Sequence, residues 1–185
     1  MEDIFVVRQQ GGLTDDELRA ALEQSLQGRN LRRVLIIPPD FTRFHSQAGK
    51  ITNLYYHLLK ARGVLVDILP ALGTHAPVTK EQWQLMYGDI PYECMMIHDW
   101  RRDVLRLGEV PAEYVKQVTE GLWQDPVDVE INRRIMDPAY DLIISPGQVV
   151  PHEVVGMANH AKNLFVGVGG NGMINSSHMI GAVYG

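Results

Sequence analysis

The chain has 185 residues and a net charge of −5, with no basic run or stripe, and this argues against nucleic acid as a partner. Its single cysteine, Cys94, lies in an apolar run, so no disulfide framework is possible within the chain. The start of the chain does not have the pattern of a signal peptide, and no apolar run is long enough to cross a bilayer. We therefore expect a globular cytoplasmic protein without membrane or nucleic-acid partners.

Helical and strand-like segments alternate along the chain. Thr14, with Glu17 three residues later, predicts the start of a helix that runs to about Gln27 and stops at Gly28. The apolar run over residues 34–37 predicts a strand that is buried on both faces. By the same patterns we expect helices over residues 47–61 and 79–87, and strands over 64–69, 93–97, 127–131 and 140–144.

This alternation predicts the fold class. Strand, loop, helix and strand in repeated order indicate a three-layer, Rossmann-like α/β domain, with a mostly parallel sheet and helices on both faces. Residues 127–131 alternate with period two, so one face of that strand should be wet. We find no interdomain linker and expect one domain over residues 1–185. Because the chain stops in small and apolar residues, we expect it to be part of a longer protein.

Polar side chains follow several predicted strands, where an open α/β sheet binds its ligands. Arg43 suits the binding of a carboxylate or phosphate, and Asp40 suits its orientation or the binding of a hydroxyl, although both also fit an ordinary loop turn. His75 follows Gly73 and suits acid–base work, with capping of the next segment as the alternative. For His98 and Asp99 we favour a strand-end pair that faces water over a metal ligand or an oriented base.

The strongest group of candidate residues lies near the end of the chain. His152, Lys162 and His178 flank one another in a stretch of glycine and apolar residues, which indicates a reactive amine with two imidazoles rather than solvated charges. Gly167, Gly169 and Gly170 suit close approach of the backbone to a phosphate, although the run is neither a Walker loop nor a full dinucleotide motif. His160 is a further candidate ligand, and an incidental glycine-rich turn is the simpler alternative.

These residues, in this order, resemble the N-terminal domain of the lactate racemase family, whose members use a nickel-pincer nucleotide. The resemblance covers about residues 31–185, and a second domain of the family has no counterpart in the chain. The motifs that carry it are Asp40-Phe41-Thr42-Arg43, Gly73-Thr74-His75, Pro151-His152, Ala161-Lys162 and Ser177-His178.

The resemblance implies a role for each of these residues. Lys162 matches the lysine that holds the cofactor through a thioamide, and His178 matches the protein ligand of nickel. His75 and His152 match two acid–base histidines, one for each hand of a 2-hydroxy acid, while Arg43 and Asp40 match the substrate-binding motif. The implied reaction is racemisation by proton-coupled hydride transfer to the cofactor. The implied partners are the missing domain, the cofactor-synthesis enzymes and the substrate.

Two positions differ from the pattern of the family. Ala76 stands where lactate racemases tend to have arginine, and Ala158-Asn159-His160 stands where they tend to have Ser-Gly-Gly. Both differences favour a 2-hydroxy acid that is larger or more polar than lactate. Two other functions remain open: a non-catalytic module that binds a nucleotide or phosphate at residues 167–172, and a zinc or iron hydrolase, which lacks a dense carboxylate–histidine motif.

Overall fold

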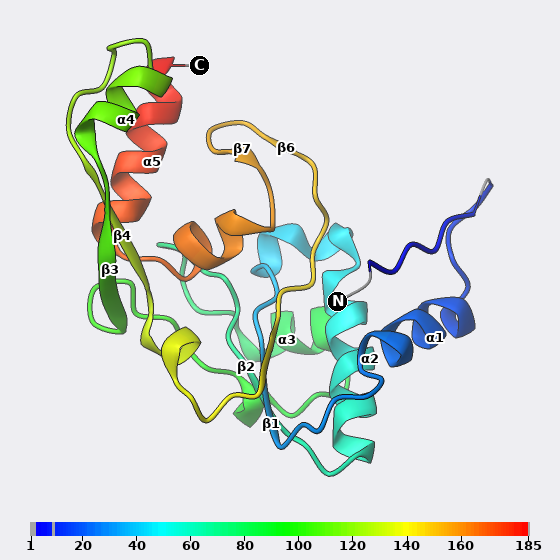
Figure 1. Cartoon of the computed structure of the whole chain (residues 1–185). Helices are drawn as coiled ribbons and strands as arrows, with labels where there is room; N and C mark the ends of the chain where they lie inside the picture. The colour runs from blue at the N-terminus through cyan, green and yellow to red at the C-terminus, as the bar shows by residue number, and fades with distance from the viewer. Residues whose placement is uncertain (1–2, 9, 185) are drawn as a thin grey trace.

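The computed structural model describes residues 3–8 and 10–184. Its centre is a three-stranded parallel sheet in the order β2-β1-β5 (Figure 1). β1 (Arg33–Ile36) pairs with β2 (Leu65–Ile68) on one side and with β5 (Leu142–Ile144) on the other. The predicted α/β class and parallel pairing are confirmed.

Helices cover one face of this sheet, and short helical turns cover the other. α1 (Asp15–Ser25), α2 (Ala48–Ala61) and α3 (Lys80–Tyr87) pack on the side chains of Val34 and Ile36. Leu35 and Ile37 face the opposite layer, which includes the 3₁₀ turn Arg133–Met136 and the π-helical turn Asn163–Gly167. The capping boxes predicted at Thr14 and Thr79 both form. α1 ends two residues before the expected Gln27.

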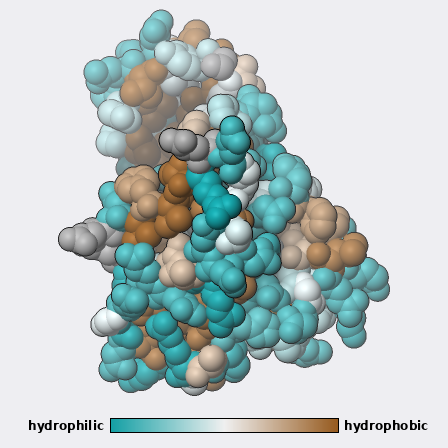
Figure 2. Space-filling model, turned by 90° about the vertical axis from the view of Figure 1, so that its right-hand side faces the viewer, coloured by the Kyte–Doolittle hydropathy of each residue, from teal (hydrophilic) through white to brown (hydrophobic). Residues whose placement is uncertain are grey.

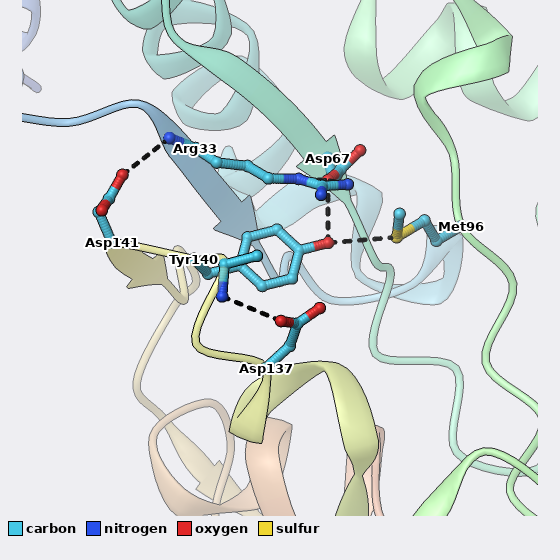
Figure 3. A network of polar contacts seen from close by, with 7 residues as sticks. Arg33, Asp67, Met96, Asp137, Tyr140 and Asp141 are labelled. Carbon is cyan, nitrogen blue, oxygen red and sulfur yellow. Dashed lines mark hydrogen bonds and ion pairs between the residues drawn. The ribbon is translucent and has the colours of Figure 1, made fainter.

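A polar network joins the three strands near their amino ends (Figure 3). The Arg33 guanidinium donates to the Asp67 carboxylate at 2.8 Å and lies over the Tyr140 ring, 4.9 Å from its centroid. The Tyr140 hydroxyl donates to the same carboxylate at 2.9 Å, and the Asp141 carboxylate accepts from the Arg33 backbone N–H at 2.9 Å. Partial burial and the Asp67 carboxylate raise the pKa of Tyr140 to about 12. The network therefore ties the three strands together at the edge of the sheet opposite to their carboxyl ends.

The strand predicted over residues 93–97 is wrong. A 3₁₀ turn, Tyr92–Cys94, follows Pro91, and its i to i+3 bonds use the amides of Cys94 and Met95. The segment keeps an isolated parallel bridge between Ile68 and Met95, in which the Met96 N–H donates to the Ile68 carbonyl at 2.7 Å. The turn therefore prevents a fourth parallel strand.

The strand predicted over residues 127–131 forms as β4 (Val127–Asn132), but its place in the parallel sheet needs correction. It lies outside the parallel sheet and pairs antiparallel with β3 (Val104–Val110), which the sequence patterns did not predict. α4 (Ala112–Val118) connects the two strands. This ribbon lies beside α5 (Asn171–Tyr184), the last helix of the chain (Figure 1).

A small hairpin completes the fold. β6 (Pro151–His152) and β7 (Gly156–Met157) pair antiparallel after β5. The hairpin packs closely on α5, because a Cβ at Gly181 would lie 2.0 Å from the Val154 carbonyl oxygen. On the face drawn in Figure 2, apolar side chains form separate patches divided by hydrophilic surface. Among the described residues, no helix has both the length and the apolar character needed to span a bilayer.

Candidate active site

One cavity of about 240 Å³ lies where β1, β2 and β5 end. Its wall combines the loops after these strands with the β6–β7 hairpin, the π-helical turn and α5. Of the predicted site residues, seven line it: Asp40, Arg43, His75, His152, Lys162, Gly167 and His178. The edge of the sheet therefore brings together residues that are far apart in the sequence.

Asp40 and His75 form a hydrogen-bonded pair at this edge. The Asp40 Oδ2 atom lies 2.5 Å from His75 Nδ1, and its Oδ1 atom accepts from the Thr42 hydroxyl at 2.6 Å. The Asp40 side chain is 10% exposed, whereas the His75 side chain is 59% exposed. Since both carboxylate oxygens already accept hydrogen bonds, these contacts favour the orientation of His75 by Asp40. The substrate-binding role of Asp40 stays a prediction.

Gly73 has a structural task in the loop that carries His75. Its φ of 56° lies in the left-handed region, which glycine adopts without strain. The Gly73 N–H donates to the Gly167 carbonyl at 2.7 Å. This bond links the loop after β2 directly to the turn that carries Lys162.

Two cations face the cavity without a carboxylate partner. Among the described residues, no carboxylate lies within ion-pair distance of Arg43 or Lys162. Burial, and then the charge of Arg43, lower the pKa of Lys162, while Asp40 and Glu153 act in the opposite direction. The cavity is therefore suited to an anion, and the lowered pKa makes the Lys162 amine easier to deprotonate than an exposed lysine.

His152 lies on β6 with its side chain only 7% exposed. Its Nδ1 atom accepts from the backbone N–H groups of Val154 at 3.1 Å and Val155 at 3.4 Å. Burial and the charge of Lys162 lower the pKa of His152, against an opposite effect of Glu153. Both the burial and the two N–H donors of the hairpin turn favour the neutral imidazole.

His178 lies on α5, and its Nδ1 atom is 2.7 Å from the Ile174 carbonyl oxygen. A carbonyl oxygen only accepts, so Nδ1 carries the proton and Nε2 keeps a free lone pair. This is the arrangement in which a histidine ligates a metal while its other nitrogen is held by a backbone group. Among the described residues, no group of three or more histidine, cysteine or acidic side chains is placed to hold a metal ion. The role of His178 as a metal ligand stays a prediction.

The glycine run behaves differently from the rest of the predicted site. Gly167 lines the cavity, whereas Gly169 and Gly170 pack against protein. A Cβ at Gly169 would lie 1.8 Å from the Phe165 carbonyl oxygen, and one at Gly170 would lie 2.4 Å from the Glu130 carboxylate. Glu130 also accepts from the Gly172 N–H at 2.8 Å at the start of α5. These contacts indicate close packing, and the cofactor-binding role of the three glycines stays a prediction.

A network of amide side chains holds the turn that carries Lys162. The buried Asn163 side chain donates to the Asn159 amide oxygen at 2.7 Å and to the Ser145 hydroxyl at 3.2 Å. Asn159 and His160 adopt positive φ angles of 59° and 47°. The sequence analysis missed Asn163, and it named Asn159 only as a difference from the family pattern. For Asn159, the available signal is the tolerance of asparagine for left-handed backbone.

His98 lies outside the cavity, and the expectation that it faces water is wrong. It is 4% exposed, its Nε2 atom lies 2.9 Å from the Gly169 carbonyl oxygen, and its Nδ1 atom accepts from the Asn132 side chain at 3.0 Å. Burial lowers its pKa. His98 therefore ties the loop after the 3₁₀ turn to the glycine run. Its neighbour Asp99 is partly buried, and exposed His160 does not line the cavity.

The fold and the cavity define an α/β domain whose cavity holds an oriented histidine, a lysine and an arginine without an ion-pair partner among the described residues, and a histidine held by a backbone carbonyl. The chain matches the family model of the lactate racemase N-terminal domain over residues 16–184, and it belongs to this family. A search of curated proteins finds no match.

Two solved structures share the fold. A protein from Thermotoga maritima is 24% identical with a TM-score of 0.79, and the match covers 91% of this chain and 41% of that one. The lactate racemase apoprotein from Thermoanaerobacterium thermosaccharolyticum is 20% identical with a TM-score of 0.58, and the match covers 83% of this chain and 37% of that one. The matches thus cover less than half the length of both structures.

Proposed function

We propose that this chain is the cofactor-bearing part of a racemase or epimerase that acts on a 2-hydroxy acid. The single observation that carries the proposal is the cavity itself. It brings a free arginine, an Asp40-oriented histidine, a lysine of lowered pKa and the metal-competent His178 to one place. Membership of the lactate racemase family supports a racemase-related role.

The cofactor in this proposal is a nickel-pincer nucleotide. When bound, it supplies a centre that accepts and returns the hydride at the α-carbon of the substrate. Lys162 would hold it through a thioamide, for which a half-buried amine of lowered pKa is well suited. His178 would supply the protein ligand of nickel through Nε2, because the Ile174 carbonyl holds Nδ1.

The remaining cavity residues bind the substrate and move its proton. Arg43 would bind the carboxylate, since a planar guanidinium without a protein partner suits bidentate recognition. His75 and His152 are the candidates for exchange of the hydroxyl proton. Ala76 and the Asn159-His160 pair, where the family tends to have arginine and glycines, favour a substrate that is larger or more polar than lactate.

The proposal includes further partners. A second domain of the family type would close the cavity and add substrate-binding groups, and cofactor-synthesis enzymes would load Lys162. Both belong to a cytoplasmic setting, in which a reduced Cys94 is expected.

Intact-mass spectrometry tests the cofactor assignment. The chain is produced alongside the cofactor-synthesis enzymes, and we expect a covalent adduct on Lys162 together with about one bound nickel per chain. Lys162→Ala should lose the adduct, whereas Lys80→Ala, a change at an exposed lysine outside the cavity, should retain it. Racemisation of a panel of 2-hydroxy acids by the loaded protein with its second domain then identifies the substrate. Absence of both adduct and nickel from that longer protein would exclude the proposal.

The same variants separate this function from a nucleotide- or phosphate-binding module. Such a module would bind a mononucleotide without metal, and binding would survive both Lys162→Ala and His178→Ala. The Glu130 carboxylate on the Gly172 N–H weighs against an anion at the start of α5, because it already uses that donor.

A further inference from the structure

A buried histidine outside the cavity contacts the segment that joins two of the predicted site residues. The π-helical turn begins directly after Lys162, and the next helix, α5, carries His178. Only residues 168–170, all of them buried, connect the two elements. His98 is 4% exposed, and its Nε2 atom lies 2.9 Å from the Gly169 carbonyl oxygen. His98 therefore contacts the link that sets the spacing between the lysine and the second histidine.

The hydrogen bonds of His98 define one protonation state. A carbonyl oxygen only accepts, so the proton of neutral His98 lies on Nε2 and is donated to Gly169. Nδ1 keeps its lone pair and accepts from the side-chain amide of Asn132 at 3.0 Å. The amide oxygen of Asn132 accepts in turn from the Arg134 N–H at 3.0 Å. A second proton on His98 would therefore point at the N–H groups of the Asn132 amide, and this amide cannot turn over without losing its bond to Arg134.

Backbone bonds from β4 hold the same link. The Asn132 N–H donates to the Val168 carbonyl at 2.7 Å, and the Val168 N–H donates to the Asn163 carbonyl at 3.0 Å, in the turn that follows Lys162. β4 is thus joined to this turn through the main chain, and His98 adds a side-chain bond one residue nearer to α5. Loss of the side-chain bond alone should therefore affect the position of α5 relative to the turn.

The surroundings of His98 favour its neutral state. Asp103 and Asp99, in the same loop, favour a proton on the imidazole, but burial has the larger effect and lowers the pKa of His98. The imidazole is therefore mostly neutral at about pH 7.5, and the network with Asn132 is intact there. The other charged side chains beside this loop and the link are those of Arg102, Arg133 and Glu130.

We propose that His98 is a positioning residue of the cofactor site: through the Gly169 carbonyl, it holds Lys162 and His178 at the spacing at which one bound cofactor reaches both side chains. The inference rests on the proposed function, which assigns these two side chains to one cofactor. Metal–ligand distances tolerate a deviation of only about 0.2 Å, so a small shift of α5 is enough to weaken the contact of His178. His98 lies outside the cavity and acts only through the link.

Nuclear magnetic resonance of the ¹⁵N-labelled chain tests the positioning without cofactor. His98→Leu removes the donor and keeps apolar volume, whereas His98→Gln keeps a side-chain N–H for the Gly169 carbonyl. We expect His98→Leu to shift the backbone amide signals of residues 168–178 and the imidazole signals of His178, and His98→Gln to restore most of the parent positions. The signals of α1 should stay unchanged in both variants. Shifts spread evenly over the chain, or equal shifts in the two variants, would overturn the inference.

The pH profile gives a readout that a loss of stability does not produce. Asn132→Asp keeps an oxygen for the Arg134 N–H and places an ionised oxygen opposite Nδ1 of His98, which stabilises the doubly protonated ring. We expect the pH midpoint of the His98 signals to rise by about one unit or more, and the Gly169 amide signal to follow the same midpoint. In the parent, the Gly169 signal should follow His98 at a lower pH. A Gly169 signal that follows His98 in neither chain would contradict the role of the link, and this result decides even where His98→Leu does not fold.

Cofactor loading connects the positioning to the proposed function. In chains produced alongside the cofactor-synthesis enzymes, His98→Leu should carry about tenfold less nickel-containing adduct on Lys162 than the parent, and His98→Gln should recover most of it. The matched control is His57→Leu, a change at an exposed histidine on α2 that contacts Asp89 outside the cavity, and it should stay within about twofold of the parent. Equal loading of His98→Leu and the parent would reject the inference. Absence of the adduct from the parent, with the expected shifts of His178, would reject the proposed function, while the spectra would still support the link between His98 and His178.

Discussion

The cavity has two halves that are built by different means. Asp40, Arg43 and His75 follow β1 and β2, whose side chains are largely buried and whose register is fixed by backbone ladders. The other half lies outside the parallel sheet. His152 is on β6 of the small hairpin, Lys162 directly precedes the π-helical turn, and His178 is on the last helix. The second half is held by side-chain networks, by close glycine contacts and by a few backbone hydrogen bonds, such as that from the Asn132 N–H to the Val168 carbonyl at 2.7 Å.

The difference shows where each half is sensitive to mutation. The sheet half depends on burial of many apolar side chains, a cooperative property that tolerates single surface changes. The second half depends on a few buried polar groups and on backbone contacts that leave no room for a Cβ. Substitutions remote from the cavity wall should therefore disturb Lys162 and His178 more than Arg43 and His75.

The largest expected effect comes from Gly169→Ala. The added Cβ would lie 1.8 Å from the Phe165 carbonyl oxygen, so the backbone of the run must move. We expect a loss of about 3 kcal/mol or more in the free energy of unfolding, measured by urea denaturation. Gly12→Ala is the control, because nothing lies within 4 Å of its Cβ position, and it should stay within about 0.5 kcal/mol of the parent. Equal stability of the two variants would contradict the packing role of the run.

Asn163→Ala should have the next largest effect. It removes a buried side chain that donates to Asn159 and Ser145, which leaves both acceptors without this donor. We expect a loss of about 1–3 kcal/mol in the free energy of unfolding. The control is Asn175→Ala, which breaks an exposed bond to Asn171 at 2.9 Å on α5 and should change stability by no more than about 0.5 kcal/mol. A loss confined to the control would show that the network does not hold the turn.

Acid should lower the stability of the second half of the cavity through protonation of His98. Burial lowers its pKa in the folded chain, against the opposing charges of Asp103 and Asp99, so the unfolded chain binds the proton more readily. Stability from this group is complete above the ordinary pKa of 6.5 and is lost as the pH falls through the lowered value. From about pH 7.5 to pH 5, the parent should lose on the order of 1 kcal/mol more than His98→Gln.

The control for this pH series is His45→Gln, a change at an exposed histidine on the cavity rim. Its unfolding free energy should follow that of the parent across the same range. A parent and a His98→Gln variant with parallel pH profiles would show that protonation of His98 does not oppose folding.

The smallest expected effect is a change in chemical reactivity. Because burial and Arg43 lower the pKa of Lys162, its amine should become reactive at a lower pH than an exposed lysine such as Lys80. Acylation with a small reagent, followed by peptide mass spectrometry across a pH series, measures both midpoints in one sample. Arg43→Gln should bring the Lys162 midpoint closer to that of Lys80. Coincident midpoints in the parent would contradict the lowered pKa.

Sequence reasoning succeeded where local patterns carry the information. The capping residues Thr14 and Thr79 and the apolar runs of β1 and β2 predict elements that form close to the expected bounds. It failed for residues 93–97 and for the partner of β4, because strand pairing depends on segments far away in the chain. The buried state of His98 was missed for the same reason, since its partners Asn132 and Gly169 are remote in sequence.

The sequence by itself determined the α/β class, the candidate residues and the family resemblance, because residue types, their order and short-range periodicity are local properties. Only the tertiary structure decided that six candidate side chains and Gly167 share one cavity, whereas Gly169 and Gly170 pack away from it. It also decided which nitrogen of each histidine is left for chemistry. That choice depends on whether an acceptor, as at His75, or a donor, as at His152, lies opposite Nδ1.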